Sequence, residues 1–427
     1  MSSYLIIVCF LGVLPLGAMA YYIGRNKASA KESQEGRRLH SRPGAYGWYA
    51  VIWMAAPAVA LNGIAALLHW FGLVTLPSEL LVPASGVLFI AGLGLGLRTI
   101  SPGLQARNIV ERWIRGLLLA ASLISILTTV GIVVSILFEA IKFFQLVSFW
   151  DFLTGTQWSP DTAFLGGAGR GGEAVAKPDF GSVPIFAGTF MITAIAMVVA
   201  VPIGLFAAIF MSEYATHRMR GAMKPMLEIL AGIPTVVYGF FAAITVSPLV
   251  VQLAESIGLE ADYTNALTPG LVMGIMIIPF VSSLSDDVIS AVPQSLREGS
   301  YALGTTRSET IKQVLLPAAL PGIVSAVLLA VSRALGETMI VVMAAGLRPN
   351  LTWNPLEGMT TVTVRIVDAL TGDQAFDSPE TLSAFGLGLV LLMVTLTLNI
   401  VSTIVIRKFK QKHEQPQTPR HETTRHA

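Results

Sequence analysis

Long apolar runs separated by short polar segments are the main pattern along this chain. A transmembrane helix needs about 20 predominantly apolar residues, and nine runs reach or approach that length. The pattern therefore predicts an all-α, polytopic membrane protein with about nine transmembrane helices. The expected spans are Tyr4 to Gly24, Trp48 to Leu68, Leu80 to Leu97, Ile114 to Phe138, Val183 to Met211, Met226 to Val251, Pro269 to Leu284, Leu320 to Leu347 and Ser383 to Ile406.

The basic residues favour one orientation of these spans. Of the 28 Lys and Arg residues, 22 lie in one set of connecting segments and 5 in the alternate set. Because short cytoplasmic loops are enriched in Lys and Arg, we expect the basic set to be cytoplasmic, the N-terminus outside and the C-terminus inside. The basic set is 25–47, 98–115, 214–224, 286–318 and 407–427, and the alternate set is 69–79, 139–182, 254–268 and 348–382.

Composition agrees with a membrane protein and excludes several classes of site. The chain is 53% hydrophobic and 13% charged, whereas soluble proteins are about 25% charged. Cys9 is the only cysteine, so neither an intrachain disulfide nor a cysteine-rich metal site can form. The six histidines have no metal-ligand spacing. We therefore expect no metal and no cofactor bound by this chain.

Charge and apolar patterning divide the chain into four expected regions. The motif-bearing core follows a long external loop, and the C-terminal tail has no apolar periodicity and is expected to be disordered. The regions are 1–113, an N-terminal extension with about three transmembrane helices and a charged cytoplasmic linker; 114–182, the first core helix and the long loop; 183–406, the core with a polar loop at 286–318; and 407–427, the tail.

The polar loop 286–318 carries the start and stop signals of two short helices. Pro293 suits the first turn of a helix that runs to Leu303, and Gly304 suits the left-handed conformation that ends it. Thr306 and Glu309 form a Thr-x-x-Glu capping box at the start of the second helix. The loop is therefore expected to be a helical hairpin.

The two faces of this hairpin have different expected roles. On the first helix Gly299, Ser300 and Leu303 are expected to share a face that a partner could approach closely, with Glu298 beside it. The alternative is an amphipathic hairpin at the membrane surface with Glu298 merely solvated. On the second helix an apolar stripe is expected to end at a proline pair before the next span. The stripe is Ile311, Val314 and Leu315, and the prolines are Pro317 and Pro321.

Two charged residues fall near the middle of the eighth expected span. Arg333 and Glu337 are four residues apart, so on a continuous helix they would share a face and could pair. An arginine in that position should face a cavity or a partner, and its fork of donors suits an oxyanion. The alternative is a structural ion pair that locks two helices. Glu228 is a weaker candidate of the same kind, for which snorkelling to the interface is the competing explanation.

The chain has no recognisable ATPase motif. Gly299 and Gly304 have the glycine spacing of a phosphate-binding loop, but Thr305 occupies the position where that loop needs lysine. If ATP drives this protein, another chain must supply the ATPase.

Three sequence elements, which are Gly232 to Gly239, the polar loop and Ser332 to Thr338, together resemble the permeases of phosphate-specific ABC importers, and a fourth distinguishes between types. The polar loop resembles the Glu-Ala-Ala, Gly, Ile-x-Leu-Pro motif of ABC importer permeases, which couples them to their ATPase. The Arg-Ala-Leu-Gly-Glu-Thr element is typical of the phosphate-specific PstC and PstA permeases, and the Gly-Thr-Gln-Trp-Ser-Pro element favours the PstC type. The matching residues are Glu298, Gly299, Ser300, Gly304, Val314, Leu316 and Pro317; Gly232 to Gly239; Ser332 to Thr338; and Gly155 to Pro160.

The resemblance implies a type I, MetI-like transmembrane core in the bacterial inner membrane. It implies a transport subunit, not an enzyme, that carries inorganic phosphate inward while separate subunits hydrolyse ATP. The implied partners are a PstA-like second permease, two PstB-like ATPases that bind ATP and Mg, a periplasmic PstS-like phosphate-binding protein and membrane lipid, with no nucleic acid. It also implies that Arg333 and Glu337 belong to the translocation pathway or gate. Importers of molybdate or sulfate, and a secondary transporter, remain alternatives.

Overall fold

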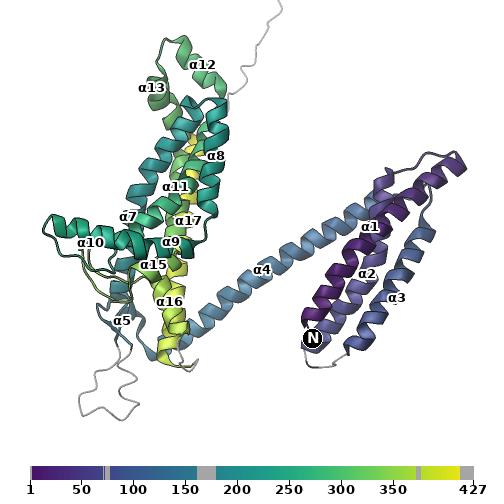
Figure 1. Cartoon of the computed structure of the whole chain (residues 1–427), viewed down its shortest axis with the longest axis horizontal. Helices are drawn as coiled ribbons and strands as arrows, with labels where there is room; N and C mark the ends of the chain where they lie inside the picture. Colours follow the sequence, from purple (N-terminus) through teal and green to yellow (C-terminus); the bar gives the residue numbers. More distant parts are fainter. Residues whose placement is uncertain (1, 71, 73–76, 161–178, 372–376, 414–427) are drawn as a thin grey trace, which may run out of the picture. The chain divides into compact units, whose positions relative to one another are not determined.

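The computed structural model describes residues 2–70, 72, 77–160, 179–371 and 377–413, with side chains from residue 15 to residue 404 except residues 70 and 78. Residues 161–178 of the expected external loop and residues 414–427 of the expected tail lie outside the described part. The described chain is almost entirely helical and divides into two compact units, residues 1–131 and 132–427. The boundary lies within one long helix, α4 (Ala106–Leu146) (Figure 1).

The first unit is built from three helices and the beginning of α4. The helices are α1 (Ser2–Glu35), α2 (Pro43–Trp70) and α3 (Ser78–Thr99). Gly92 lets α3 approach α2 closely, because a Cβ there would lie 2.2 Å from the Trp53 carbonyl oxygen. The polar end of the unit is tied down by Lys31 Nζ, which donates to Ile100 O at 2.7 Å, and by Tyr46 OH, which donates to Leu104 O at 2.9 Å.

The second unit begins with an aromatic cluster that joins the end of α4 to a short helix and a two-stranded sheet. Phe143, Phe152, Trp158 and Phe180 pack edge to face with ring centroids 5.4 to 6.4 Å apart. Trp158 pairs with Phe180 in the antiparallel ladder. The elements are α5 (Phe149–Thr154), β1 (Trp158–Ser159) and β2 (Asp179–Phe180).

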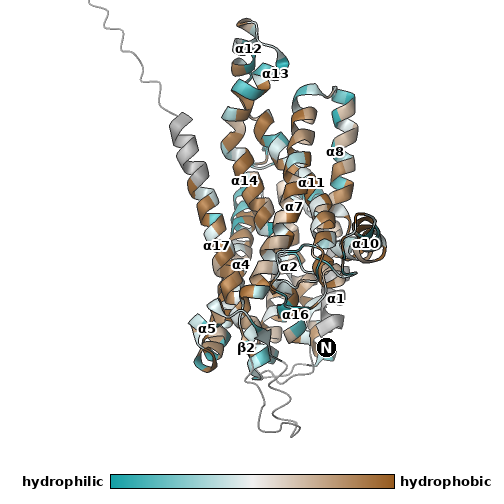
Figure 2. Cartoon of the chain, turned by 90° about the vertical axis from the view of Figure 1, so that its left-hand side faces the viewer, coloured by the Kyte–Doolittle hydropathy of each residue, from teal (hydrophilic) through white to brown (hydrophobic). Residues whose placement is uncertain are grey.

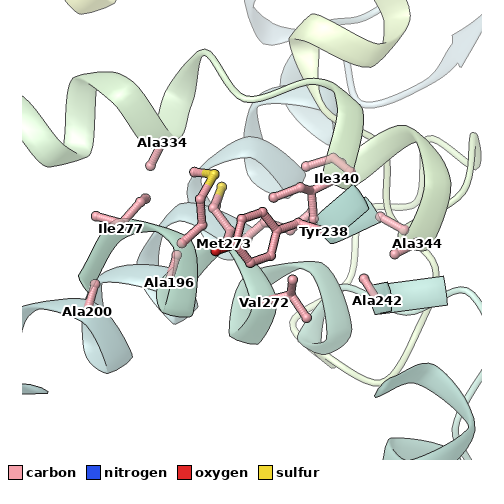
Figure 3. Close-up of a cluster of buried hydrophobic side chains, with 14 of the residues drawn as sticks. Ala196, Ala200, Tyr238, Ala242, Val272, Met273, Ile277, Ala334, Ile340 and Ala344 are labelled. Atoms are coloured by element: carbon pink, nitrogen blue, oxygen red, sulfur yellow. The ribbon is translucent and has the colours of Figure 1, made fainter. Parts of the chain in front are cut away.

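The core of the second unit lies around α7 (Val183–Ile209) and α11 (Leu267–Ser290). These two helices pack closely because Gly270 and Gly274 of α11 face Ile195 and Val199 of α7, which leave no room for a Cβ. Figure 3 shows small and flexible side chains from several helices, among them Ala196 and Met273, filling the space between them. α14 (Leu316–Leu335) and α16 (Val362–Thr371) pack against this pair, and α17 (Pro379–His413) packs against α14 and α16.

Eight helices of the described part are long and apolar enough to cross a membrane. The first expected span, Tyr4 to Gly24, lies in α1, where the side chains of residues 2–14 are outside the described part. Each of the other expected spans overlaps one of the eight helices, but the sixth and eighth are interrupted and do not form single helices. Figure 2 shows hydrophobic residues along much of α7, α14 and α17. The expectation of an all-α, polytopic membrane protein is confirmed.

The sixth expected span is wrong as a single helix. Met226 lies in α8 (His217–Gly232), and the chain breaks at Ile233, whose backbone is extended. The cause is Pro234, because a proline disfavours the helical conformation in the residue before it. The chain then continues through α9 (Thr235–Phe241), η2 (Ala242–Val246) and α10 (Ser247–Ser256). α10 runs crosswise to α7 and α11 (Figure 1).

The eighth expected span, Leu320 to Leu347, is also interrupted. α14 ends at Leu335, and α15 (Met339–Ala344) begins after a three-residue break. Gly336 follows α14 directly, and glycine is a poor helix former. The break leaves Glu337 outside both helices.

Candidate functional site

The polar loop forms a helical hairpin whose first helix and capping residues are those that the sequence predicts. α12 (Gln294–Ala302) begins after Pro293, and Gly304 has a positive φ of 82°. Thr306 and Glu309 form the expected capping box at the start of α13 (Arg307–Thr310): the Thr306 N–H donates to Glu309 Oε2 at 2.8 Å and the Glu309 N–H donates to Thr306 Oγ1 at 3.4 Å. α12 and α13 lie beyond the ends of α8 and α11 (Figure 1).

The expectation that Pro317 and Pro321 end the second helix is wrong. α13 continues through η3 (Ile311–Leu315), a π-helical turn, directly into α14. The Leu316 N–H bonds to the Ile311 carbonyl five residues back, which interrupts the ordinary helical ladder just where the proline lacks a donor. Pro317 therefore lies in the first turn of α14. The loop is also shorter than 286–318, because residues 286–290 are the last turn of α11.

The apolar stripe of the hairpin packs against the rest of the chain. Ile311 and Leu315 are buried in one cluster with Ala208 of α7 and with Ile289. Leu316 packs against the same cluster, and Val314 is half-buried. The second half of the motif therefore fixes the hairpin to the helical bundle.

A partly buried ion pair that the sequence does not indicate holds the start of α12. Arg297 pairs with Glu213 of η1 (Phe210–Tyr214) at 3.2 Å, and their side chains are 12% and 9% exposed. Arg297 also donates to the carbonyl oxygens of Ile289 at 2.8 Å and Val292 at 2.7 Å. Ile289 lies in the last turn of α11, and Val292 follows that helix. α12, η1 and the end of α11 are thereby connected through one guanidinium. The partners lie 84 residues apart, so no local spacing indicates the pair.

Ser300 does not share the exposed face of α12, contrary to the expectation. It is buried, and its hydroxyl forms a triangle with those of Thr305 and Thr310 at 2.6 and 3.0 Å. The other two residues expected on this face are exposed: Leu303 is 86% exposed, and a Cβ at Gly299 would meet open space. In the described part of the chain, the Glu298 side chain has no hydrogen bond or ion pair. Gly299, Leu303 and Glu298 therefore form a free surface, which Ser300 supports from inside.

The expected pairing of Arg333 with Glu337 is wrong. Arg333 lies in the last turn of α14, whereas Glu337 lies in the break. The Glu337 carboxylate accepts from the backbone N–H groups of Met339 at 3.1 Å and Ile340 at 3.4 Å, so it caps α15. The Arg333 guanidinium lies over the Phe280 ring, 5.6 Å from its centroid. No ion pair of Arg333 is found among the described residues.

Arg333 instead lines a cavity between α8, α11 and α14. The cavity has a volume of about 240 Å³, and its other charged lining residues are Lys224, Glu228 and Asp286. Asp286 is fully buried and accepts two hydrogen bonds from Arg220 Nη2, at 2.8 and 3.0 Å. These bonds join α8 to α11 beside the cavity. In the described ranges, no group of His, Cys, Asp and Glu is arranged to hold a metal ion.

Comparison with known proteins agrees with this architecture. Residues 200–414 match the family described as "Binding-protein-dependent transport system inner membrane component". The chain belongs to this family. Residues 10–76, within the first unit, match a second family model described as "Phosphate ATP-binding cassette transporter".

Individual relatives cover most of both chains. The probable ABC transporter permease protein YqgH of Bacillus subtilis is 34% identical over 68% of this chain and 89% of its own length. The phosphate transport system permease protein PstC 1 of Mycobacterium tuberculosis is 33% identical over 70% of this chain and 92% of its own length. The PstC protein of Haemophilus influenzae is 30% identical over 66% and 91%. The resemblance to phosphate-specific importer permeases is confirmed, and the chain is a multi-pass membrane protein of the ABC permease class.

Proposed function

We propose that this chain is the PstC-type permease subunit of an ABC importer that takes up inorganic phosphate. The observation that carries the proposal is the α12 hairpin, which presents Gly299 and the 86% exposed Leu303 beyond the bundle and is held to α11 and η1 by Arg297. The open space at Gly299 beside the exposed Leu303 would let the surface of a partner approach the backbone of α12 closely. The names of the relatives in M. tuberculosis and H. influenzae support phosphate as the cargo.

The hairpin gives a mechanism for coupling. An ATPase subunit that binds the exposed face of α12 and moves on ATP binding would displace α12. Arg297 and the cluster around Leu315 would transmit the displacement to α11 and α14. Both helices line the cavity at Arg333, so the motion would change access to it. The seven motif residues would thus have two roles. Glu298 and Gly299, with the neighbouring Leu303, would serve docking, and the other five would hold the hairpin: Ser300, Gly304, Val314, Leu316 and Pro317.

The rest of the assembly follows from this role. The chain would lie in the bacterial inner membrane with its N-terminus outside and its C-terminus cytoplasmic. Its partners would be a PstA-like second permease, two PstB-like ATPases carrying ATP and Mg, and a periplasmic PstS-like phosphate-binding protein. The chain itself would bind no cofactor and catalyse no reaction. Arg333 would be its principal contact with the anion, and Glu337 would fix the break beside it.

Reconstitution tests the proposal. Vesicles that contain the assembled complex should accumulate labelled phosphate only when ATP is supplied on the ATPase side and the binding protein on the other. Uptake driven by a proton or sodium gradient without an ATPase would overturn the proposal in favour of a secondary transporter. Stronger ATP-dependent uptake of sulfate or molybdate than of phosphate would assign another oxyanion.

A further inference from the structure

The cavity at Arg333 has a carboxylate on its wall that the proposed mechanism does not use. Glu228 comes from α8, and Arg333 faces the same cavity from α14. The cavity volume of about 240 Å³ compares with roughly 10–15 Å³ needed for one water on the same measure. It therefore has room for a tetrahedral oxyanion together with several waters.

The other charges of the cavity are already paired. Asp286 accepts both hydrogen bonds from Arg220, and Lys224 Nζ lies 3.6 Å from Asp287 Oδ1 and 4.0 Å from Asp286 Oδ2. The side chains of Glu228 and Arg333 form no hydrogen bond or ion pair with any described residue, and the Arg333 guanidinium contacts the face of the Phe280 ring. The cavity thus offers one uncommitted cation and one uncommitted carboxylate, which are not in contact with each other.

These two groups make different demands on an anion. The Arg333 guanidinium has donors only, so it binds the unprotonated, charged oxygens of an oxyanion most strongly. An ionised carboxylate has acceptors only, so an oxyanion beside Glu228 must present an O–H group. Inorganic phosphate carries at least one proton near neutral pH, whereas sulfate and molybdate carry none. Phosphate can therefore satisfy both groups at once, and a fully ionised oxyanion would set its oxygens against the carboxylate.

We propose that Glu228 is a specificity-determining residue of the translocation pathway, which accepts a hydrogen bond from the protonated oxygen of phosphate while Arg333 binds the unprotonated oxygens. This inference rests on the proposed function and deepens it. It assigns selection against sulfate and molybdate to repulsion between like charges, which is an effective way to reject a wrong ligand. Arsenate has the same protonation as phosphate and is not rejected by this device.

The test measures anion binding to the assembled complex in lipid nanodiscs without the external binding protein, so that the permease itself selects. Labelled phosphate and sulfate are the probes. Glu228→Gln should weaken phosphate binding about tenfold, the loss typical of one charged hydrogen bond, and should strengthen sulfate binding, because the amide can donate. The matched control is Glu255→Gln on α10, an exposed glutamate away from the cavity, which should change neither.

A second readout locates the bound anion. Ser283 lines the same cavity, so a cysteine placed there in a Cys9→Ser background reports occupancy through its rate of modification. Phosphate should slow the modification more than sulfate does, and Glu228→Gln should remove the difference. Protection by the two anions to the same extent in the unsubstituted Glu228 background would contradict the inference.

The remaining outcomes separate this inference from the proposed function. Equal losses of phosphate and sulfate binding in Glu228→Gln would indicate a structural role for Glu228 and overturn the inference. An unchanged preference of this variant for phosphate over sulfate would also overturn it, as would the absence of phosphate binding by the wild-type complex. Each of these results is compatible with ATP-dependent phosphate uptake in vesicles. The proposed function itself fails if the wild-type complex does not take up phosphate, takes it up without an ATPase, or takes up sulfate or molybdate more strongly.

Discussion

Arg333 places a guanidinium group on a membrane helix. Among the described residues, no anionic side chain forms an ion pair with it. A charge in such a place costs at least about 2.5 kcal/mol, so it needs water, a partner or a ligand to offset the cost. The cavity beside it supplies the space, and Phe280 supports the face of the group. Glu337 has a different role, because its carboxylate is used by the backbone N–H groups that begin α15.

Replacing Arg333 should therefore affect transport more than assembly. In Arg333→Ala, ATP-dependent phosphate uptake should fall about tenfold or more, the effect of losing hydrogen bonds to a charged group. ATPase subunits should still co-purify, because Arg333 does not touch the α12 hairpin. The matched control is Arg348→Ala, an exposed arginine of the segment after α15, which should transport normally. Normal uptake by Arg333→Ala would instead favour a purely structural role for this arginine.

The sequence could indicate that Arg333 and Glu337 matter, but not how they act. The expected pairing assumed one continuous helix, and the break at Gly336 moves Glu337 away from the position four residues along. Whether a single glycine ends a membrane helix depends on packing by distant residues, as at Thr363, whose hydroxyl donates to Glu337 O at 2.9 Å. The Glu337 carboxylate instead accepts hydrogen bonds from the backbone N–H groups two and three residues further along the chain. Spacing rules for pairs of side chains do not cover such bonds.

At the scale of the element, the α12 hairpin combines local signals with distant contacts. Its caps depend on residues within four positions of one another, such as Thr306 and Glu309, and the sequence predicts them correctly. Its attachment through Arg297 and Glu213 joins segments 84 residues apart and is invisible in the sequence. The prediction that the helix ends at Pro317 was wrong for a related reason. The π-helical turn before Pro317 lets the helix continue through the proline.

The Arg297 pair should govern how well ATP hydrolysis is coupled to transport. The pair is partly buried, so removing one partner leaves the other charge without compensation, at a cost below that of a fully buried pair, which is about 3–5 kcal/mol. Arg297→Ala should therefore lower the amount of phosphate taken up per ATP hydrolysed, with the ATPase still bound. Removing both charges in Arg297→Met with Glu213→Gln should destabilise the protein less than Arg297→Ala alone. A double variant as unstable as the sum of its single changes would show that the two residues do not interact.

The exposed face of α12 should govern docking of the ATPase. Leu303→Asp removes an apolar side chain whose burial is worth about 1.5–3 kcal/mol, so co-purification of the ATPase should weaken about tenfold or more. Glu298→Lys should act in the same direction by reversing the charge beside it. Membrane insertion should be normal in both. The control is Leu259→Asp, an equally apolar exposed position in segment 254–268, which should retain the ATPase. Undiminished ATPase binding by Leu303→Asp would remove α12 from the docking surface.

For the whole molecule, hydrophobic patterning predicts the class of fold and the number of long helices but not their continuity. Span length and composition are properties of single segments, so Val183 to Met211 was found almost correctly as α7 with η1. The break before Pro234 has a local cause in the proline, but the crosswise course of α10 depends on how helices fill the second unit around Tyr238 and Met273. The same limit applies to the site: the cavity joins residues of η1, α8, α11 and α14, which only the folded chain brings together.

The orientation expected from the basic residues can be measured on the whole molecule. In a Cys9→Ser background, single cysteines replace Ser101, Ser308 and Glu260, all exposed positions of the described chain. A membrane-impermeant maleimide added outside intact spheroplasts should label Glu260→Cys and leave Ser101→Cys and Ser308→Cys unlabelled until the membrane is permeabilised. Retained phosphate uptake identifies the variants that keep the native fold. Labelling of Ser308→Cys from outside would place the α12 hairpin on the side where no ATP is available, and would invalidate the coupling role proposed for it.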